Sequence, residues 1–495
     1  LRDLAAEPSS VQKQVDDLYI KLRELFLCLC NDDFVYSSGM SPLNGKLFYC
    51  DRTFDIDTAH IDNATLLQAI RVMSYFTSRE ERVQRRVNYG ALDVEELGRA
   101  YESLLDLQPI VEEQGGRLTF RFGTGTERKT TGSYYTRPEL VQELIKSALE
   151  PVIADRLQAA KPDQREDALL GLKVCDPACG SGNFLLAAAR RIGTELAKVR
   201  TGEEAPPPDA VREAVRDVIT HCIYGVDKNP LAVDLCKVAL WIEGHSGGKP
   251  LTFLDHRIRC GDSLVGVFDL SVLEEGIPDA AFDPVSGDDK AVAKAIKKRN
   301  KEERTGQHGF AFDTAAEVHG LVEERRELET LHDDTPEEVH RKRAAWERLQ
   351  RDGGPLWRER MACHLWTAAF FSELTQEARD GQRIPTTGDL RRFLQNPDAV
   401  DARLKGYVWA LGDRNRFFHW PAEFPEVFEQ GGFDCVVGNP PWVAHAGRAA
   451  HPLPERLRRY LIACFAAFAG YRTTHGVFVE LAGRLLHHRG ALGLV

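Results

Sequence analysis

The sequence lacks several features that would place it in other classes of protein. Its 495 residues contain no apolar run of roughly 18 residues, the length that spans a bilayer, and no signal-peptide pattern at the start. The 11 cysteines form no paired C-x-x-C metal spacing, and Cys175, Cys236 and Cys435 lie within apolar runs. We therefore expect a cytoplasmic protein without a membrane partner, whose cysteines are reduced and buried.

The composition is typical of a globular protein with more than one domain. Hydrophobic residues make up 43% and charged residues 28% of the chain, whose length exceeds one ordinary core. The net charge of −11 weakly opposes a nucleic-acid partner, although a sum over the whole chain can conceal a local basic cleft. The chain begins at Leu1 and ends on ALGLV, which resembles a strand cut short, so we expect a C-terminally truncated fragment.

Four regions follow one another along the chain. Residues 1–125 predict a helical N-terminal domain, because apolar residues recur at helical spacing in VDDLYIKLRELFLCLC, ATLLQAIRVMSYF and LDVEELGRAYESLLDL. Residues 126–269 continue as strands (LKVCD, CIYGVD, RIRCGD) that alternate with helices, which indicates an α/β fold with a parallel sheet. Residues 270–430 predict a mainly helical insertion. In residues 431–495 the strand FDCVV resumes the sheet, and two helices, about 454–469 and 474–488, precede a last strand.

A glycine-rich turn follows the first predicted strand in VCDPACGSGNF, residues 174–184. Gly180 and Gly182 allow positive φ and a close backbone approach, and Ser181 adds little bulk. The turn matches neither G-x-x-x-x-G-K-[ST] nor G-x-G-x-x-G, which disfavours a phosphate cradle. A plain strand–helix turn stays open as an alternative. Asp176, just before the turn, favours a ligand with a cationic or hydroxyl end.

Polar residues also lie at the ends of the other predicted strands. Asp227 in GVDKNP suits the binding of ribose hydroxyls, with a helix N-cap by Asp227 or Asn229 as the open alternative. Asp262 in CGDSLVG would lie on the same edge of the sheet. Asn439, in the NPPW that follows FDCVV, either opens a simple turn or holds a planar group with N–H bonds. Together these four strand ends favour one shared binding site.

In order, the stretches DPACGSGNF, GVDKNP, GDSLVG and NPPW resemble the S-adenosylmethionine-dependent DNA adenine-N6 methyltransferases. GSYYTRPELVQELI, ahead of the first of them, resembles the gamma class, although Arg137 stands where the family often has a proline. FFHWPAEFPEVF and the long insertion resemble the large methyltransferases of bacterial anti-phage defence (DISARM- or BREX-like) and of fused restriction–modification enzymes. The resemblance implies the class I methyltransferase fold, a Rossmann-like parallel sheet, with residues 126–269 binding the cofactor and residues 431–495 forming the catalytic part.

The resemblance also implies a set of residues that bind S-adenosylmethionine. The glycine turn would hold its methionine part, Asp227 its ribose and Asp262 its adenine. The implied set is Tyr135, Thr136, Asp176, Pro177, Ala178, Gly180, Ser181, Gly182, Asn183, Phe184, Asp227, Lys228, Asp262, Ser263 and Asn439.

The implied catalytic residues are Asn439, Pro440, Pro441 and Trp442. If the side-chain oxygen of Asn439 and the carbonyl of Pro440 each accept one N–H of adenine's amine, its nitrogen can pyramidalise and attack the sulfonium methyl. Trp442 would stack on a base flipped out of double-stranded DNA. Neither a metal nor a covalent enzyme intermediate is needed. Other subunits of a defence system are further candidate partners, and the sequence does not indicate the DNA site.

Other interpretations stay open. They are a methyltransferase of RNA adenine or protein glutamine, and a non-catalytic DNA-binding subunit of a defence complex. A nuclease is not expected within these residues, which hold no convincing D…E-x-K cluster. The isolated histidines His419, His445 and His475 are more typical of core or surface residues than of ligands. The arginines after Asn439 suit either phosphates or an exposed helix face (Arg448, Arg456, Arg458, Arg459, Arg472).

Overall fold

A computed structural model describes most of the chain. The described residues are 1–6, 15–29, 58–77, 82–89, 96, 98, 107–124, 136–246, 249–306, 323–447, 450–470 and 472–495. Among these residues, no helix combines the length and the apolar character that crossing a membrane requires.

The centre of the fold is a parallel sheet of five strands in the order β7-β6-β5-β8-β9. Its strands are β5 (Val174–Asp176), β6 (Ile223–Asp227), β7 (Ile258–Cys260), β8 (Phe433–Gly438) and β9 (Leu486–Leu494). The chain adds β6 and β7 on one side of β5 and later returns to add β8 and β9 on the other. The strand order therefore reverses between β5 and its neighbour β8, which makes this the topological switch point of the sheet. Open α/β sheets bind ligands there, outside the carboxyl ends of the strands. The predicted α/β fold is confirmed.

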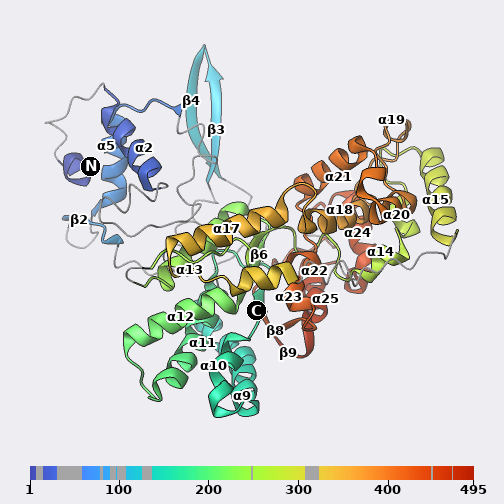
Figure 1. Cartoon of the computed structure of the whole chain (residues 1–495). Helices are drawn as coiled ribbons and strands as arrows, with labels where there is room; N and C mark the ends of the chain where they lie inside the picture. Colours follow the sequence, from blue (N-terminus) through green and yellow to red (C-terminus); the bar gives the residue numbers. More distant parts are fainter. Residues whose placement is uncertain are drawn as a thin grey trace.

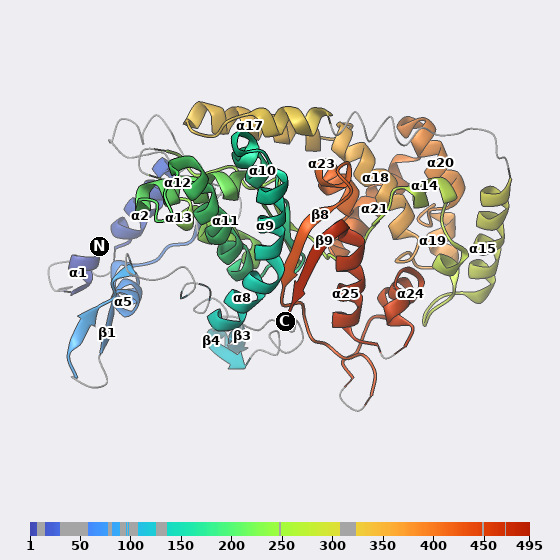
Figure 2. The same cartoon turned by 90° about the horizontal axis from the view of Figure 1, so that it is seen from below.

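Helices cover both faces of this sheet, as a parallel sheet requires. Figure 2 shows α9 on one side of β8 and β9 and α25 on the other. The first face packs against α8 (Pro138–Leu144), the π-helical turn η5 (Ile145–Leu149), α9 (Glu150–Ala159), η6 (Pro162–Gln164), α10 (Arg165–Leu170), α11 (Asn183–Thr201), α12 (Pro208–His221) and α13 (Pro230–Glu243). Val174, Ile223, Cys435 and Val437 join this core from the strands.

The second face is covered largely by the segment that the sequence predicts as an insertion. Its helices are α14 (Ser271–Glu275), η7 (Asp279–Phe282), α15 (Lys290–Thr305), α17 (Pro336–Gln350), α18 (Pro355–Ala368), α19 (Gln376–Asp380), α20 (Thr387–Gln395), η8 (Pro397–Ala399), α21 (Ala402–Asn415), α22 (Trp420–Glu423) and α23 (Pro425–Phe428). Trp420 and Phe424 share one hydrophobic core with Tyr224, Val226 and Val436 of the strands. Figure 1 shows α18, α20 and α21 together in orange. The segment is mainly helical, and much of it is part of the central core.

The last part of the chain completes the second face and then the sheet. It contains α24 (Glu455–Cys464), η9 (Ala466–Phe468) and α25 (Thr474–Leu485). The prediction of a helix to residue 488 is wrong at its end, because Leu486 pairs with Phe433 and β9 begins there. Sheet pairing with β8 outweighs the helical pattern at this point.

The N-terminal region combines helices with two antiparallel hairpins. The helices α1 (Arg2–Ala6), α2 (Asp17–Leu29) and α5 (Asn63–Ser74) enclose a small core of Ala5, Leu18, Tyr19, Leu66 and Leu67. The hairpins are β1 (Tyr75–Thr77) with β2 (Gln84–Arg86), and β3 (Leu107–Gln114) with β4 (Arg117–Thr124), drawn in cyan in Figure 1. The sequence predicts mostly helices here, and the hairpins are not predicted. Their signal is the alternation of apolar and polar residues around a Gly-Gly turn. The helix predicted for LDVEELGRAYESLLDL falls almost entirely outside the described residues.

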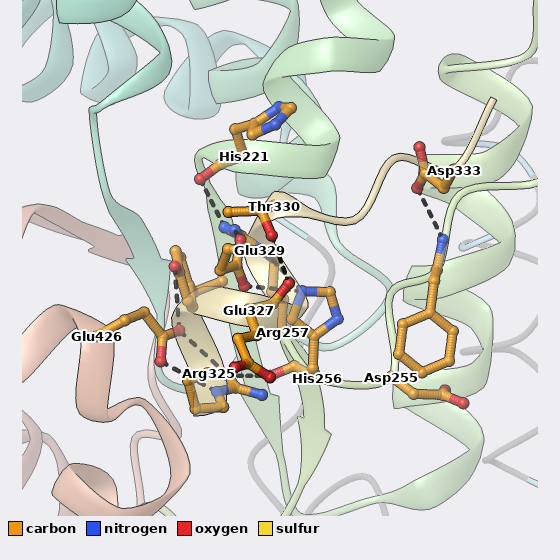
Figure 3. Close-up of polar contacts among 12 residues, drawn as sticks. His221, Asp255, His256, Arg257, Arg325, Glu327, Glu329, Thr330, Asp333 and Glu426 are labelled. Atoms are coloured by element: carbon orange, nitrogen blue, oxygen red, sulfur yellow. Dashed lines mark hydrogen bonds and ion pairs between the residues drawn. The ribbon is translucent and has the colours of Figure 1, made fainter. Parts of the chain in front are cut away.

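A buried network of charges fastens the helical residues 323–330 to the sheet (Figure 3). Arg325 is 1% exposed, and its guanidinium donates two hydrogen bonds of 3.2 Å to the carboxylate of Glu426. Arg257, also 1% exposed, donates to Glu329 and to the carbonyl of His221. Because buried charges need partners, these pairs fix the position of the segment on the sheet.

We expect Arg325→Met to lower the free energy of unfolding by about 3–5 kcal/mol, because it leaves a buried carboxylate without its cation. Urea denaturation measures this change. The matched control is Arg326→Met, which removes exposed ion pairs to Glu323 (2.6 Å) and Glu429 (2.8 Å) and is expected to cost about 0–1 kcal/mol. Equal effects of the two substitutions would contradict the role of burial.

Candidate functional site

The structure places the predicted polar residues along the carboxyl edge of the sheet. Asp176 ends β5, Asp227 ends β6, Asp262 follows β7 and Asn439 follows β8. The glycine turn is tied to its neighbours on that edge. The N–H of Gly180 donates to Asp227 over 2.9 Å, and the hydroxyl of Ser263 donates to the carbonyl of Pro177 over 2.5 Å.

Two glycines shape the turn between β5 and α11. Gly182 has φ +93°, and a Cβ there would lie 2.7 Å from the sulfur of Cys236, so this position requires glycine for packing. Gly180 has φ +53°, and a Cβ there would meet no atom within 4 Å, so its α-carbon faces open space. Ala178 and Asn183 are half-buried and Ser181 is buried, whereas Phe184 is 4% exposed and belongs to the hydrophobic core.

Asp176 is a buried carboxyl at the centre of the edge, only 1% exposed. Its Oδ1 accepts the N–H of Ala178 over 3.0 Å, and burial raises its pKa from 3.8 to about 8. Gly438, the last residue of β8, approaches so closely that a Cβ there would lie 2.6 Å from this oxygen. Among the described residues, no basic side chain pairs with Asp176. The carboxyl is therefore suited to a ligand that brings a positive charge.

Asp227 accepts two backbone hydrogen bonds, from Gly180 and, over 2.7 Å, from Asn229. Burial raises its pKa above the ordinary value. The side chain of Asn229 accepts the N–H of Leu231 over 3.0 Å and is the N-cap of α13. The open choice between Asp227 and Asn229 as the cap is therefore decided, and Asp227 faces the glycine turn.

Asp262 accepts hydrogen bonds from the ammonium of Lys228 over 2.7 Å and from the N–H of Leu264 over 3.1 Å. Its own N–H donates to the carbonyl of Arg416 over 2.7 Å, and Asp262 forms a parallel bridge with Phe417. Arg416, with φ +55°, donates over 2.6 Å to the carbonyl of Lys228. Arg416 and Phe417 thus border this end of the edge. No local pattern in the sequence indicates this, because Arg416 and Phe417 lie more than 150 residues along the chain from Asp262.

Asn439 lies at the switch point and is held from two sides. Its Nδ2 donates to the hydroxyl of Thr136 over 3.1 Å, and its Oδ1 accepts the indole N–H of Trp442 over 3.1 Å. An open cavity of about 560 Å³ begins beside it, lined by Thr136, Arg137, Glu139, Leu140, Asn439 and Val495. The structure thus brings the predicted Thr136 to Asn439. Tyr135 lies outside the described residues.

The loop after Asn439 turns at two prolines and exposes an aromatic ring. Pro440 is buried, Pro441 is half-buried and Trp442 is 58% exposed. The Trp442 ring stacks on the ring of His475, with 4.8 Å between centroids and 15° between planes. His475, set aside by the sequence analysis as a core or surface residue, is therefore part of this site.

Two of the arginines suggested for phosphates have structural partners. Arg456 donates to Asp288 over 2.5 Å, and Arg459 donates to the carbonyls of Asp283 and Phe370. Both hold α24 against the loop between η7 and α15, and Arg459 also holds it against the turn after α18. Arg448 lies outside the described residues. His419 is fully buried and its Nε2 lies 2.6 Å from Nδ1 of His364, which confirms it as a core residue. No group of three or more metal-ligating side chains occurs within the described residues.

A parallel sheet in this order, with helices on both faces and polar strand ends at its switch point, is a Rossmann-like fold, and it fits the class I methyltransferases. The comparisons with known proteins agree. The Eco57I restriction-modification methylase model matches residues 221–495, more than half of the chain, and the chain therefore belongs to that family. The model of the MmeI DNA-methyltransferase domain matches residues 156–252.

Two curated relatives and one solved structure are similar to the chain. A putative type II restriction enzyme and methyltransferase of Methanocaldococcus jannaschii is 22% identical over 461 residues, which cover 81% of this chain and 33% of the relative. The adenine-specific methyltransferase PglX of Streptomyces coelicolor is 37% identical over 115 residues, 23% of this chain and 8% of the relative. The structure of the restriction-modification enzyme MmeI in complex with DNA has a TM-score of 0.33 at 14% identity, over 61% of this chain and 42% of that one. The chain thus spans a third or less of the length of these curated relatives.

The raised pKa of Asp176 predicts a dependence of stability on pH. The folded protein holds this proton up to a pH of about 8, whereas an unfolded chain releases it near 3.8. The free energy of unfolding therefore falls, through this group, as the pH rises between these values. We expect Asp176→Asn, which cannot ionise, to gain stability over the parent from pH 5 to pH 8 in thermal unfolding. The exposed Asp155→Asn serves as the control, and a gain that shrinks as the pH rises would contradict the assignment.

Proposed function

We propose that this protein is a site-specific DNA adenine-N6 methyltransferase that transfers a methyl group from S-adenosylmethionine to an adenine flipped out of double-stranded DNA. The observation that carries the proposal is the Asn439 amide, held by Thr136 at the switch point of the sheet, beside the strand that ends in Asp176. Membership of a restriction-modification methylase family supports this function. The names of the two curated relatives, a putative type II restriction enzyme and methyltransferase and an adenine-specific methyltransferase, support adenine as the target and a role in restriction–modification. Marking host DNA in an anti-phage defence system is part of the same proposal.

The carboxyl edge fits the proposed cofactor. When bound, S-adenosylmethionine supplies an electrophilic methyl group on a positively charged sulfur. The buried carboxyl of Asp176 suits the cationic methionine part, and the open space at Gly180 leaves room for it. Asp227, fixed by two backbone N–H groups, would accept the ribose hydroxyls, and Asp262 the adenine amino group. Lys228 and Ser263 would border these positions.

Asn439 and Pro440 would activate the target amine. The amino nitrogen of adenine is a weak nucleophile because its lone pair is drawn into the ring. Two acceptors, Oδ1 of Asn439 and the carbonyl of Pro440, would bind its two N–H groups and favour a pyramidal nitrogen. The hydrogen bond from Nδ2 to the hydroxyl of Thr136 fixes the orientation of the amide, so that Oδ1 lies on the side away from Thr136 and can accept an N–H of the base. That oxygen already accepts from Trp442, and a carbonyl oxygen has a second lone pair for the base.

Methyl transfer from labelled S-adenosylmethionine, measured with the full-length protein, tests the proposal directly. Duplex DNA, RNA and a protein extract are offered in parallel, and the labelled product is identified. We expect N6-methyladenine in DNA at one sequence. Label in RNA adenine or in glutamine, with none in DNA, would assign the protein to one of the other substrate classes.

We expect Asp227→Ala to weaken the binding of S-adenosylmethionine by about 1–3 kcal/mol, the loss for hydroxyl groups left without an acceptor. Calorimetry of the parent and the variant measures this change. The substitution Asp227→Asn keeps the shape of the side chain and should bind with intermediate affinity. The exposed Asp155→Ala is the control. Parental affinity in Asp227→Ala would remove the ribose assignment.

For the chemical step, we expect Asn439→Ala to lower the rate of methyl transfer by at least about a hundredfold while cofactor affinity stays close to that of the parent. The reason is that the amide contacts the target amine, whereas the cofactor is held mainly by the aspartates. Asn439→Asp keeps an acceptor oxygen and should retain more activity than the alanine variant. Single-turnover rates on a duplex whose target adenine is unmethylated separate methyl transfer from binding and product release, and a parental rate in Asn439→Ala would disprove the catalytic role.

A further inference from the structure

The first turn of α25 holds the backbone on both sides of Trp442. The hydroxyl of Thr474 accepts the N–H of Val443 over 2.9 Å and contacts the carbonyl of Pro441. The N–H of Thr474 donates to the carbonyl of Val443 over 3.0 Å, and Ala444 forms an antiparallel bridge with Thr473. The loop after Asn439 is therefore anchored to a helix whose Val477, Phe478 and Leu481 lie in the core.

The indole of Trp442 is held in one orientation although it is mostly exposed. One ring face stacks on His475 and the N–H donates to Asn439, yet 58% of the residue is accessible to solvent. Since His475 covers one face only, the accessible area includes the opposite face. The same indole of Trp442 is hydrogen-bonded to Asn439, whose amide is proposed to bind the target amine.

We propose that His475 is a positioning residue for the target base. It holds the Trp442 ring so that the opposite face is ready to stack on a flipped adenine whose amine reaches Asn439. This inference rests on the proposed function. A long side chain that is ordered before the base arrives loses less entropy on binding, so its contact contributes more to affinity. Flat heterocycles suit this task, because every base has a π-face on which they stack.

A structural role for His475 within the hydrophobic core does not explain its position. The buried residues of α25 are Val477, Phe478, Leu481, Ala482 and Leu485, whereas His475 is only half-buried and its ring contact is with Trp442. A metal role lacks partners, since no metal-ligating group of three occurs within the described residues. The stack on Trp442 remains the feature that accounts for an imidazole here.

The test uses the full-length protein and two duplexes: one keeps the adenine found to be methylated and serves for kinetics, and the other carries 2-aminopurine in its place and reports base flipping. We expect His475→Ala to raise KM for DNA and to weaken the 2-aminopurine signal of base flipping, each by about tenfold. The reason is that the Trp442 side chain would then lose its freedom only when the base binds, and this loss would weaken binding by about that factor. The value of kcat and the affinity for S-adenosylmethionine should stay near those of the parent. His475→Phe, which keeps a flat ring, should restore both signals, and the exposed His488→Ala should change neither.

A second readout needs neither DNA nor activity. The fluorescence anisotropy assigned to Trp442, obtained as the difference between each protein and its Trp442→Phe derivative, should fall in His475→Ala and recover in His475→Phe. Unchanged anisotropy in His475→Ala would overturn the inference, and so would a loss confined to kcat. If the ring loosens but the parent methylates no DNA, the proposed function fails and the base-capture part of this inference fails with it.

Discussion

The pairing of β5 with β8 is the interaction on which the whole candidate site depends. It joins residues about 260 positions apart in the chain and brings the carboxyl end of each strand to one edge. The approach is so close that Gly438 has no space for a Cβ beside the carboxyl of Asp176. A larger residue at 438 would separate the two strand ends. Asn439, which follows β8, would then lie farther from the glycine turn, which follows β5.

The second face of the sheet shows why that pairing is stable. Its cover comes from helices between residues 355 and 428, which share a core with the strands instead of forming one of their own. The same segment continues into Arg416 and Phe417, which border Asp262 at the edge. The wall of the site is thus continuous with the core. The buried charge network around Arg325 and Glu426 adds a further attachment for the helices that cross the sheet.

Electrostatics divides the edge into two parts. At the glycine turn, burial raises the pKa of both Asp176 and Asp227. A cationic ligand group beside Asp176 would favour its ionised form and lower that pKa again. At the loop after β8, the groups that hydrogen-bond to Asn439 and to the loop are uncharged: an amide, an indole and the hydroxyls of Thr136 and Thr474. Arg137 and Glu139 line the cavity beside them. A neutral, aromatic rim suits an uncharged base, whereas the carboxyls suit a cation. The two kinds of ligand therefore have separate places on one sheet edge.

The sequence by itself determined the strands, the glycine turn and the polar residue at each strand end, because each depends on residues adjacent in the chain. Parallel strands then require those ends to share an edge, so the grouping of Asp176, Asp227, Asp262 and Asn439 could be predicted. Only the tertiary structure decided that Asn229 caps α13 and that Phe184 lies in the core. It also decided that Arg456 and Arg459 bind loops between preceding helices and that His475 stacks on Trp442. In each case the residues adjacent in the chain allow more than one partner for the side chain. Packing between elements that are distant in the chain decides which partner it has.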